Sequence, residues 1–286
     1  MAEKKLSIGI IGLGLIGGSI LKGLQVFGNF KINAFSANEK TIQSVNKLKN
    51  CHAANNINIL KDSDVIFICT PIHKIIEDVK NILPIVKKEC IIADVASLKE
   101  DILNEINESI ECKFIGTHPM AGTENSGFEA SFSTLFEDTK WVIIPSKWVT
   151  EEDVQTLTEI IKTLNAQPLT ADAKSHDKAA AIISHTPMLI SQAIFAALIK
   201  TQDEEVRNLA SKLASSGFKD MTRLALSNTT MASDMLKLNK DNINEVLESI
   251  HAQEKMLMLP HYFHKTIEEI IEKRLEMYSK EGKNRL

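Results

Sequence analysis

Histidine and the cationic side chains are the residues of this chain most able to do chemistry on an anionic small molecule. His118 ends a short apolar run directly before Pro119, and a neutral histidine could accept a hydroxyl proton near neutral pH. Lys219 and Arg223 are four residues apart, so on a helix they would share one face, and the guanidinium of Arg223 can bind a carboxylate through two parallel donors. The same spacing suits a solvated helix face, and a histidine before a proline also occurs as a plain loop residue.

Three glycines near the N-terminus indicate a dinucleotide-binding turn. Gly12, Gly14 and Gly17 follow an expected strand and open an expected helix, which is the context this fingerprint requires. The first permits a tight turn, the second lets backbone approach a pyrophosphate, and the third lets helix and strand pack closely. Leu15 and Ile16 stand in the turn just before the expected helix, whose free N–H groups would face the phosphates. NAD or NADP is the expected cofactor, and a glycine-rich turn without a ligand is the alternative.

The residue at the end of the second expected strand bears on the choice between NAD and NADP. NAD-specific enzymes place a carboxylate there to hold the ribose 2′-hydroxyl, whereas this chain has Ser36. A hydroxyl can donate to a 2′-phosphate that a carboxylate would repel, which slightly favours NADP. Ala37 follows where an arginine would strengthen that preference, and Lys40 is the nearest cation. Both cofactors stay open.

Short apolar runs alternate with amphipathic segments through the first half of the chain, the pattern of βαβ units around a parallel sheet. The expected strands are residues 6–11, 31–35, 65–69, 90–95, 114–117 and 141–145. The expected helices between them are residues 17–27, 39–48, 74–83 and 99–109. The pattern predicts an α/β fold with a Rossmann-type, doubly wound and mostly parallel sheet, in which ligands bind just past the strand ends.

Helical periodicity dominates the sequence from Thr150, where a capping-box-like start precedes an amphipathic helix. The helices expected after it are residues 172–199, 204–214, 230–238 and 241–278. Pro187 and Pro260 should kink or divide theirs. The pattern predicts a C-terminal all-helical domain beside the Rossmann-type one.

The change of pattern places the boundary between the two predicted domains. Residues 1–149 are expected to form the dinucleotide-binding domain, and residues 150–286 the helical substrate-binding and dimerisation domain. Residues 172–199 are apolar nearly all round, which predicts their burial, in part at the interface of a homodimer.

The bulk composition is that of an ordinary folded protein. Hydrophobic residues make up 44% of the 286, charged residues 24%, and the net charge is −4. These values exclude a disordered or fibrous chain, and without a basic stripe nucleic acid is not an expected partner; nor is a membrane. The four cysteines are isolated and lack the paired spacing of metal ligands, so no metal site is predicted: Cys51, Cys69, Cys90 and Cys112. They are expected to be reduced thiols, which predicts a location in the cytoplasm.

Six segments together resemble the prephenate/arogenate dehydrogenase family over nearly the whole chain, from Leu6 to about Glu276. They are residues 69–71, 94–99, 118–124, 175–177, 184–187 and 217–223. The resemblance implies NAD(P)-dependent oxidative decarboxylation of prephenate to 4-hydroxyphenylpyruvate, or of arogenate to tyrosine, in tyrosine biosynthesis. The two substrates differ by a keto or an amino side chain, and the sequence leaves both open.

The resemblance also implies roles for single residues near the substrate. It makes His118 the catalytic group, lets Ser97 bond the substrate hydroxyl, and puts Glu124 at the site entrance. It places His176 near the carboxylate end of the substrate, and Lys219 and Arg223 as cations that face the substrate.

Further implied residues bind the cofactor or set selectivity. Besides the glycine turn and Ser36, the implied cofactor contacts are Thr70, Pro71 and Ser184. Many family members carry a histidine just after the proline of the 184–187 segment, where this chain has Met188. This departure bears on which side chain of the substrate is accepted.

Two other functions fit parts of the pattern. A β-hydroxyacid-type dehydrogenase has the same two-domain plan, but such enzymes use a catalytic lysine on the helical domain. A non-catalytic dinucleotide sensor would need the glycine fingerprint without a reason for His118, Ser97 and Arg223 to occur together. Their co-occurrence favours the tyrosine-pathway dehydrogenase.

Overall fold

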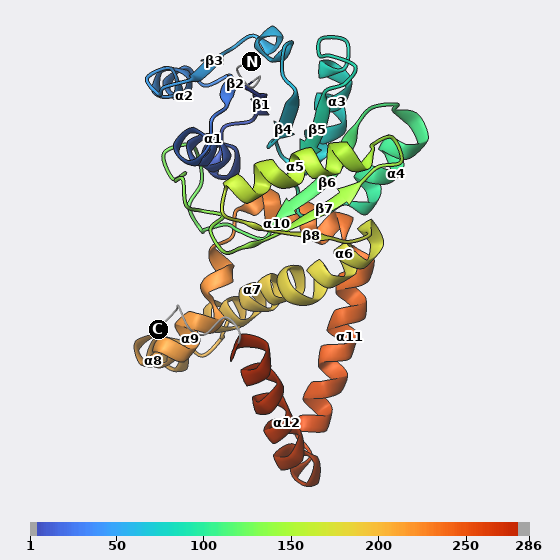
Figure 1. Cartoon of the computed structure of the whole chain (residues 1–286). Coiled ribbons are helices and arrows are strands. Elements are labelled where there is room, and N and C mark those ends of the chain that lie inside the picture. The colour runs from blue at the N-terminus through green and yellow to red at the C-terminus, as the bar shows by residue number, and fades with distance from the viewer. Residues whose placement is uncertain (1–4, 280–286) are drawn as a thin grey trace. The chain divides into compact units, whose positions relative to one another are not determined.

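The computed structural model describes residues 5–279 and divides into two compact units, the first ending at Asn239 and the second beginning at Lys240. The first unit contains an eight-stranded sheet in the order β3-β2-β1-β4-β5-β6-β7-β8 (Figure 1). Its strands are β1 (Ser7–Ile11), β2 (Lys31–Phe35), β3 (Cys51–Ala54), β4 (Val65–Ile68), β5 (Ile91–Asp94), β6 (Phe114–Pro119), β7 (Lys140–Pro145) and β8 (Gln167–Thr170). All neighbours run parallel except β6 and β7, which confirms the predicted mostly parallel, doubly wound sheet.

The helices of the first unit cover the sheet and then continue without strands. Those that alternate with the strands are α1 (Leu15–Phe27), α2 (Glu39–Val45), α3 (Ile75–Ile82), α4 (Glu100–Ser109) and α5 (Glu151–Thr163). Those that follow are α6 (Ala173–Ala180), α7 (Thr186–Ile199), α8 (Glu204–Leu213), α9 (Ser216–Met221) and α10 (Thr229–Leu238). Short 3₁₀ turns lie at Ile57–Leu60, Ile72–Lys74 and Arg223–Leu226.

Alternate residues of the central strands face two separate apolar cores. Ile10 and Phe67 belong to the core that α1 and α5 share, whereas Ile68 belongs to the core that α3 and α4 share. Because both faces are covered, these strands read as continuous apolar runs instead of alternating ones. The resulting slab aligns the carboxyl ends of β1, β4, β5 and β6 along one edge.

The sheet continues beyond the predicted domain boundary at 149/150. Thr150 and Asp153 form the predicted capping box, and Leu157 and Ile161 of α5 are buried in the core shared with α1. Strand β8 then pairs in parallel with β7. Residues 150–170 therefore belong structurally with the sheet, and a functional division at 149/150 remains a prediction.

The helix predicted at residues 172–199 is interrupted in its middle. A π-helical turn, Ala181–His185, separates α6 from α7, and Pro187 stands in the first turn of α7. A proline has no N–H to continue the regular hydrogen-bond ladder, so the helix widens just before it. By length and composition alone, Ala173–Ile199 could cross a membrane, but the core helices of soluble proteins pass the same test, and 22% of its most apolar window is buried.

The second unit is a pair of helices. They are α11 (Lys240–Leu257) and α12 (Pro260–Ser279), and they pack against each other. Pro260 begins α12, so the predicted division at this proline is confirmed.

Candidate active site

The glycine turn between β1 and α1 has the geometry of a dinucleotide cradle. Gly12 has a φ of +89°, and a Cβ there would press on the backbone of Cys69 and Thr70. Gly14 has nothing within 4 Å of the place where its Cβ would stand, which leaves space in front of the turn. At Gly17 a Cβ would collide with the carbonyl oxygen of Gly12. The three glycines thus fit the turn, the approach and the packing that a bound pyrophosphate requires.

The start of α1 is open to an anion. Gly14 is its N-cap and offers no side-chain hydrogen bond, and no acidic side chain lies in its first turn. The N–H groups at Leu15 and Ile16 therefore lie at an uncapped, positive helix end. This arrangement fits a phosphate-bearing cofactor.

Ser36 lies where the ribose of such a cofactor would be read. It is 9% exposed at the end of β2, and its hydroxyl oxygen accepts the backbone N–H of Asn38 at 3.2 Å. The hydroxyl proton stays available for a ligand. This geometry is compatible with both NAD and NADP.

Thr70 and Pro71 follow the end of β4, next to the glycine turn. The Thr70 hydroxyl donates to the Asp78 carboxylate at 2.5 Å, and Pro71 caps the 3₁₀ turn that leads into α3. Thr70 is thereby tied to α3 instead of projecting freely. Both residues lie at the sheet edge that their predicted cofactor contact requires.

The end of β6 carries His118 and is fixed to the end of β5. The backbone N–H of Thr117 donates to Oδ1 of Asp94 at 3.0 Å, and the Thr117 hydroxyl donates to the Asp94 carbonyl. The Asp94 carboxylate also accepts a hydrogen bond from the ammonium group of Lys99, and neither side chain has any exposed surface. Burial lowers the pKa of Lys99, while Asp94 acts in the opposite direction. A buried ion pair therefore lies at the carboxyl edge of the sheet, in contact with Thr117, the residue before His118.

His118 contacts a second predicted site residue. Its Nδ1 lies 2.9 Å from Nε2 of His176, and the two rings meet edge to face with an interplanar angle of 75°. His176 is 5% exposed, and its own Nδ1 lies 2.7 Å from Oδ1 of Asp177. Both ring nitrogens of His176 are thus engaged by protein groups, an arrangement that does not favour its predicted place against the substrate's carboxylate.

The surroundings keep His118 uncharged. Burial lowers its pKa well below the ordinary value for histidine, and the ammonium group of Lys99 lowers it further. At neutral pH the imidazole is therefore a free base. A neutral histidine at the edge of a dinucleotide-binding sheet can accept a proton from a substrate hydroxyl.

Ser97 and Glu124 lie on loops of the same edge. Ser97 is half-buried between β5 and α4, and Glu124 is exposed on the long loop between β6 and β7. Both positions are compatible with a substrate approaching from solvent, and their predicted contacts stay predictions.

Lys219 and Arg223 are not joined to His118 by any contact in residues 5–279. They also do not share the one helix that their spacing predicts, because α9 ends at Met221 and Arg223 opens a 3₁₀ turn. Both side chains are exposed and form no ion pair within the described chain. In Figure 1, α9 lies beside α8 at the C-terminal end of α7, whereas His176 lies on α6 at the opposite end.

The helical segment near Ser184 contains a second buried histidine. Ser184 is half-buried in the π-helical turn, and the next residue, His185, is fully buried. The amide of Asn239 donates to His185 Nδ1 at 2.9 Å. Burial lowers the pKa of His185 to about 4, so this imidazole is neutral as well. The π-helical turn, which a sequence pattern does not specify, brings these groups together.

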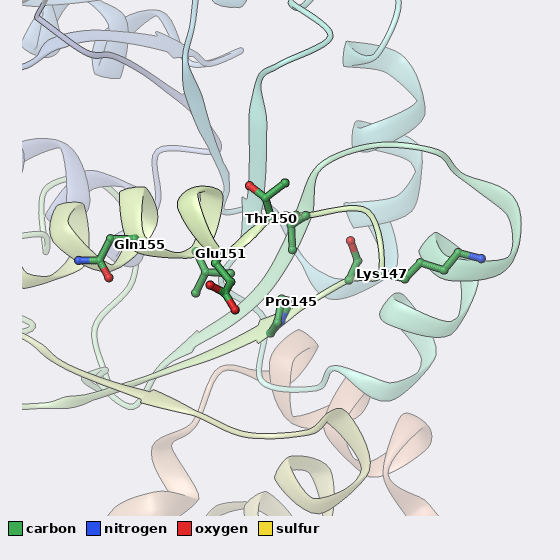
Figure 2. Close-up of a pocket in the computed structure, with 8 residues that line it drawn as sticks. Pro145, Lys147, Thr150, Glu151 and Gln155 are labelled. Carbon is green, nitrogen blue, oxygen red and sulfur yellow. The ribbon is translucent and has the colours of Figure 1, made fainter.

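One hollow between side chains lies away from His118. It encloses about 320 Å³ and is lined by Pro145, Lys147, Thr150, Glu151 and Gln155, among others (Figure 2). Pro145 pairs with Ile115 near the start of β6, so this hollow faces the edge opposite His118. It is not part of the candidate active site.

Fold and site together define a dinucleotide-dependent oxidoreductase with a base at the carboxyl edge of its sheet. Residues 22–169 match the model of the prephenate dehydrogenase nucleotide-binding domain, and residues 172–271 match that of the prephenate dehydrogenase dimerization domain. The chain belongs to the prephenate dehydrogenase family.

Individual relatives agree with this assignment. The chain is 30% identical to a prephenate dehydrogenase of Lactococcus lactis over 250 residues, covering 84% of this chain and 67% of the relative. An arogenate dehydrogenase structure from Synechocystis is 27% identical, with a TM-score of 0.77 and coverage of 96% and 98% of the two chains. A prephenate dehydrogenase structure from A. aeolicus, in complex with hydroxyphenyl propionate and NAD⁺, has a TM-score of 0.86 at 24% identity and covers 98% and 99%.

Proposed function

We propose that this protein catalyses the NAD(P)-dependent oxidative decarboxylation of prephenate to 4-hydroxyphenylpyruvate, or of arogenate to tyrosine. The observation that carries the proposal is the neutral His118 at the same sheet edge as the Gly12 turn. Relatives named as prephenate and arogenate dehydrogenases support both substrates. A β-hydroxyacid dehydrogenase would leave the role of His118 unexplained.

His118 acts as the general base in this proposal. As hydride leaves the ring carbon that bears the hydroxyl, the hydroxyl proton moves to the imidazole, which relieves the positive character on that carbon. Such a base contributes about 10²–10⁴-fold, or roughly 3–5 kcal/mol of the barrier. Loss of the ring carboxylate as carbon dioxide then restores aromaticity, and this driving force belongs to the substrate.

Other residues of the chain hold the two ligands. The Gly12 turn and the start of α1 would hold the pyrophosphate, with Ser36 near the ribose. NAD(P) bound there supplies the hydride acceptor. Ser97 is proposed to orient the substrate hydroxyl, and Arg223 to bind a substrate carboxylate with two parallel donors.

We further propose a homodimer in the cytoplasm. The match of residues 172–271 to a dimerization domain and the exposed apolar side chains of α7 and α8 support self-association through the helical part. The four cysteines form no disulfide, which suits a reducing compartment.

A single assay tests the reaction and its alternatives. Purified protein is offered prephenate and arogenate, each with NAD⁺ and NADP⁺, and both reduced nicotinamide and carbon dioxide are measured. We expect equal amounts of the two products with at least one substrate. Reduction without carbon dioxide would favour a β-hydroxyacid-type enzyme, and cofactor binding without any turnover would favour a sensor.

The role of His118 is tested by His118→Asn. We expect kcat to fall by about 10²-fold or more while dinucleotide affinity is kept, because the proton acceptor alone is lost. His52→Asn, at an exposed position of β3, is the matched control and should leave kcat unchanged. Unchanged turnover in His118→Asn would refute the assignment.

A further inference from the structure

The carboxylate that contacts His176 is itself held by another element. Oδ1 of Asp177 accepts the backbone N–H of Lys99 at 2.9 Å, and Oδ2 accepts that of Glu100 at 2.9 Å. The start of α4 has no side-chain cap of its own, so Asp177, distant in sequence, supplies the acceptor that its first turn needs. Asp177 is 4% exposed, and both of its carboxylate oxygens act as hydrogen-bond acceptors.

This anchoring determines which ring nitrogens carry protons. Because Asp177 accepts, Nδ1 of His176 must donate to it, and a neutral imidazole then keeps Nε2 as an acceptor. The 2.9 Å contact between the rings therefore runs from Nδ1–H of His118 to Nε2 of His176. A neutral His118 with its proton on Nδ1 has its lone pair on Nε2, which no hydrogen bond from residues 5–279 reaches.

The same chain of hydrogen bonds also suits the product of proton transfer. Once its Nε2 is protonated, His118 still donates Nδ1–H to His176, so no bond to the protein has to break. The Asp177 carboxylate attracts the new positive charge through the intervening ring. The geometry therefore serves the free base before transfer and the imidazolium after it.

We propose that His176 and Asp177 are positioning residues, which hold His118 in the tautomer whose Nε2 accepts the hydroxyl proton of the substrate. The inference rests on the proposed role of His118 as the base. It gives His176 a task different from the carboxylate contact that its sequence segment implies.

Asp177→Asn tests the proposal by reversing the order of protons. The side-chain amide can accept from the start of α4 only through its oxygen, which leaves its NH₂ group to donate to His176. Nε2 of His176 then becomes a donor, and His118 is driven to carry its proton on Nε2. We expect kcat to fall by about 10²–10⁴-fold, with KM and the dissociation constant of NAD(P) within about threefold of the parent values.

A second aspartate of α6 provides the matched control. Asp172 is exposed and caps α6 by accepting the Ser175 N–H at 2.9 Å. Asp172→Asn makes the same chemical change outside the site, and asparagine caps helices as well as aspartate does. It should keep parental kcat, whereas a loss of cofactor affinity in Asp177→Asn equal to its loss of kcat would overturn the positioning role.

The proton order can be read without any turnover. In ¹⁵N NMR of the histidine-labelled protein with NAD(P) bound, His118, assigned with His118→Asn, should show an unprotonated Nε2 and a protonated Nδ1. The parent spectrum alone tests the proposal if Asp177→Asn does not fold. A protonated Nε2 in the parent, or kcat within threefold of the parent in Asp177→Asn, would overturn the inference. Inactivity of the parent with both substrates would refute the proposed function and leave the NMR result standing.

Discussion

The carboxyl edge of the sheet and the helices that follow it, α7 to α10, differ in how many of their side chains are buried against the same chain. At the edge, the polar groups of Asp94, Lys99 and His176 are buried and paired with other groups of the same chain. Along α7 to α10, one small cluster of three buried residues forms the core: Met188, Ala232 and Met235. Large apolar side chains there stay exposed, including Leu213 at 70% and Leu226 at 68%.

We call the carboxyl edge of the sheet the closed region, because its polar side chains are paired within one chain. We call α7 to α10 the open region, because its exposed side chains are available to another molecule. His118, His176 and Asp177 contact one another within a single chain. The exposed apolar faces are suited to a second subunit. The cations Lys219 and Arg223, which form no ion pair within residues 5–279, are suited to an anionic substrate. Substitutions in the two regions should therefore have different consequences.

The largest expected effect lies in the closed region and concerns stability. Lys99→Met leaves the buried Asp94 carboxylate without its cation, so we expect the free energy of unfolding to fall by about 3–5 kcal/mol. Urea-induced unfolding at one fixed protein concentration measures it. The control is Lys80→Met, which removes an exposed pair with Glu105 and should cost less than about 1 kcal/mol. If both variants lose the same free energy of unfolding, the Lys99–Asp94 pair is not buried as described.

The sequence predicts the central sheet better than its margins. Six of the eight strands follow from apolar runs, but β3 and β8 do not. Both are edge strands: β3 contributes Cys51 and two alanines, and β8 is mostly exposed and contains Pro168, so neither shows a core-facing pattern.

The sequence predicts which residues belong to the candidate site but not which of them contact one another. His118 and His176 are 58 residues apart, and nothing local specifies that their rings meet. Asp177 belongs to the 175–177 segment, but the sequence assigns it no role, because its anchoring to α4 arises only from the packing of α6 on α4. The glycine turn was predictable because its three residues are local.

The next largest effect lies in the open region and concerns substrate binding. Arg223→Ala should lower kcat/KM by roughly 2–4 kcal/mol, chiefly through KM, because a dianionic substrate loses a fixed cation. Arg223→Lys keeps the charge but loses the planar fork, so it should restore the value only in part. Steady-state kinetics with Lys212→Ala, an exposed cation of α8, provides the comparison. If Arg223→Ala and Lys212→Ala behave alike, Arg223 does not bind the substrate.

A smaller effect is expected on self-association. Val206, Leu209 and Leu213 lie on one face of α8, and none is buried in the single chain. Leu209→Asp should weaken the dimer about 10–100-fold, the range of a residue near the centre of an interface. Leu169→Asp changes an equally exposed leucine on β8 and should leave the dimer intact. Analytical ultracentrifugation decides, and a parent that is monomeric at micromolar concentration would contradict the dimer itself.

The smallest expected effect concerns cofactor choice and is tested at Ser36, at the end of β2. Ser36 already accepts the Asn38 N–H, so Ser36→Asp can keep that bond while adding a carboxylate for the ribose hydroxyls and repelling a 2′-phosphate. We expect the parent to accept NADP⁺ and the variant to shift the ratio of kcat/KM values toward NAD⁺ by about tenfold, or ~1.4 kcal/mol. Ser44→Asp on α2 adds the same charge away from the ribose and should leave the ratio unchanged. Strict use of NAD⁺ by the parent would mean that the absence of a carboxylate at position 36 does not decide cofactor choice in this chain.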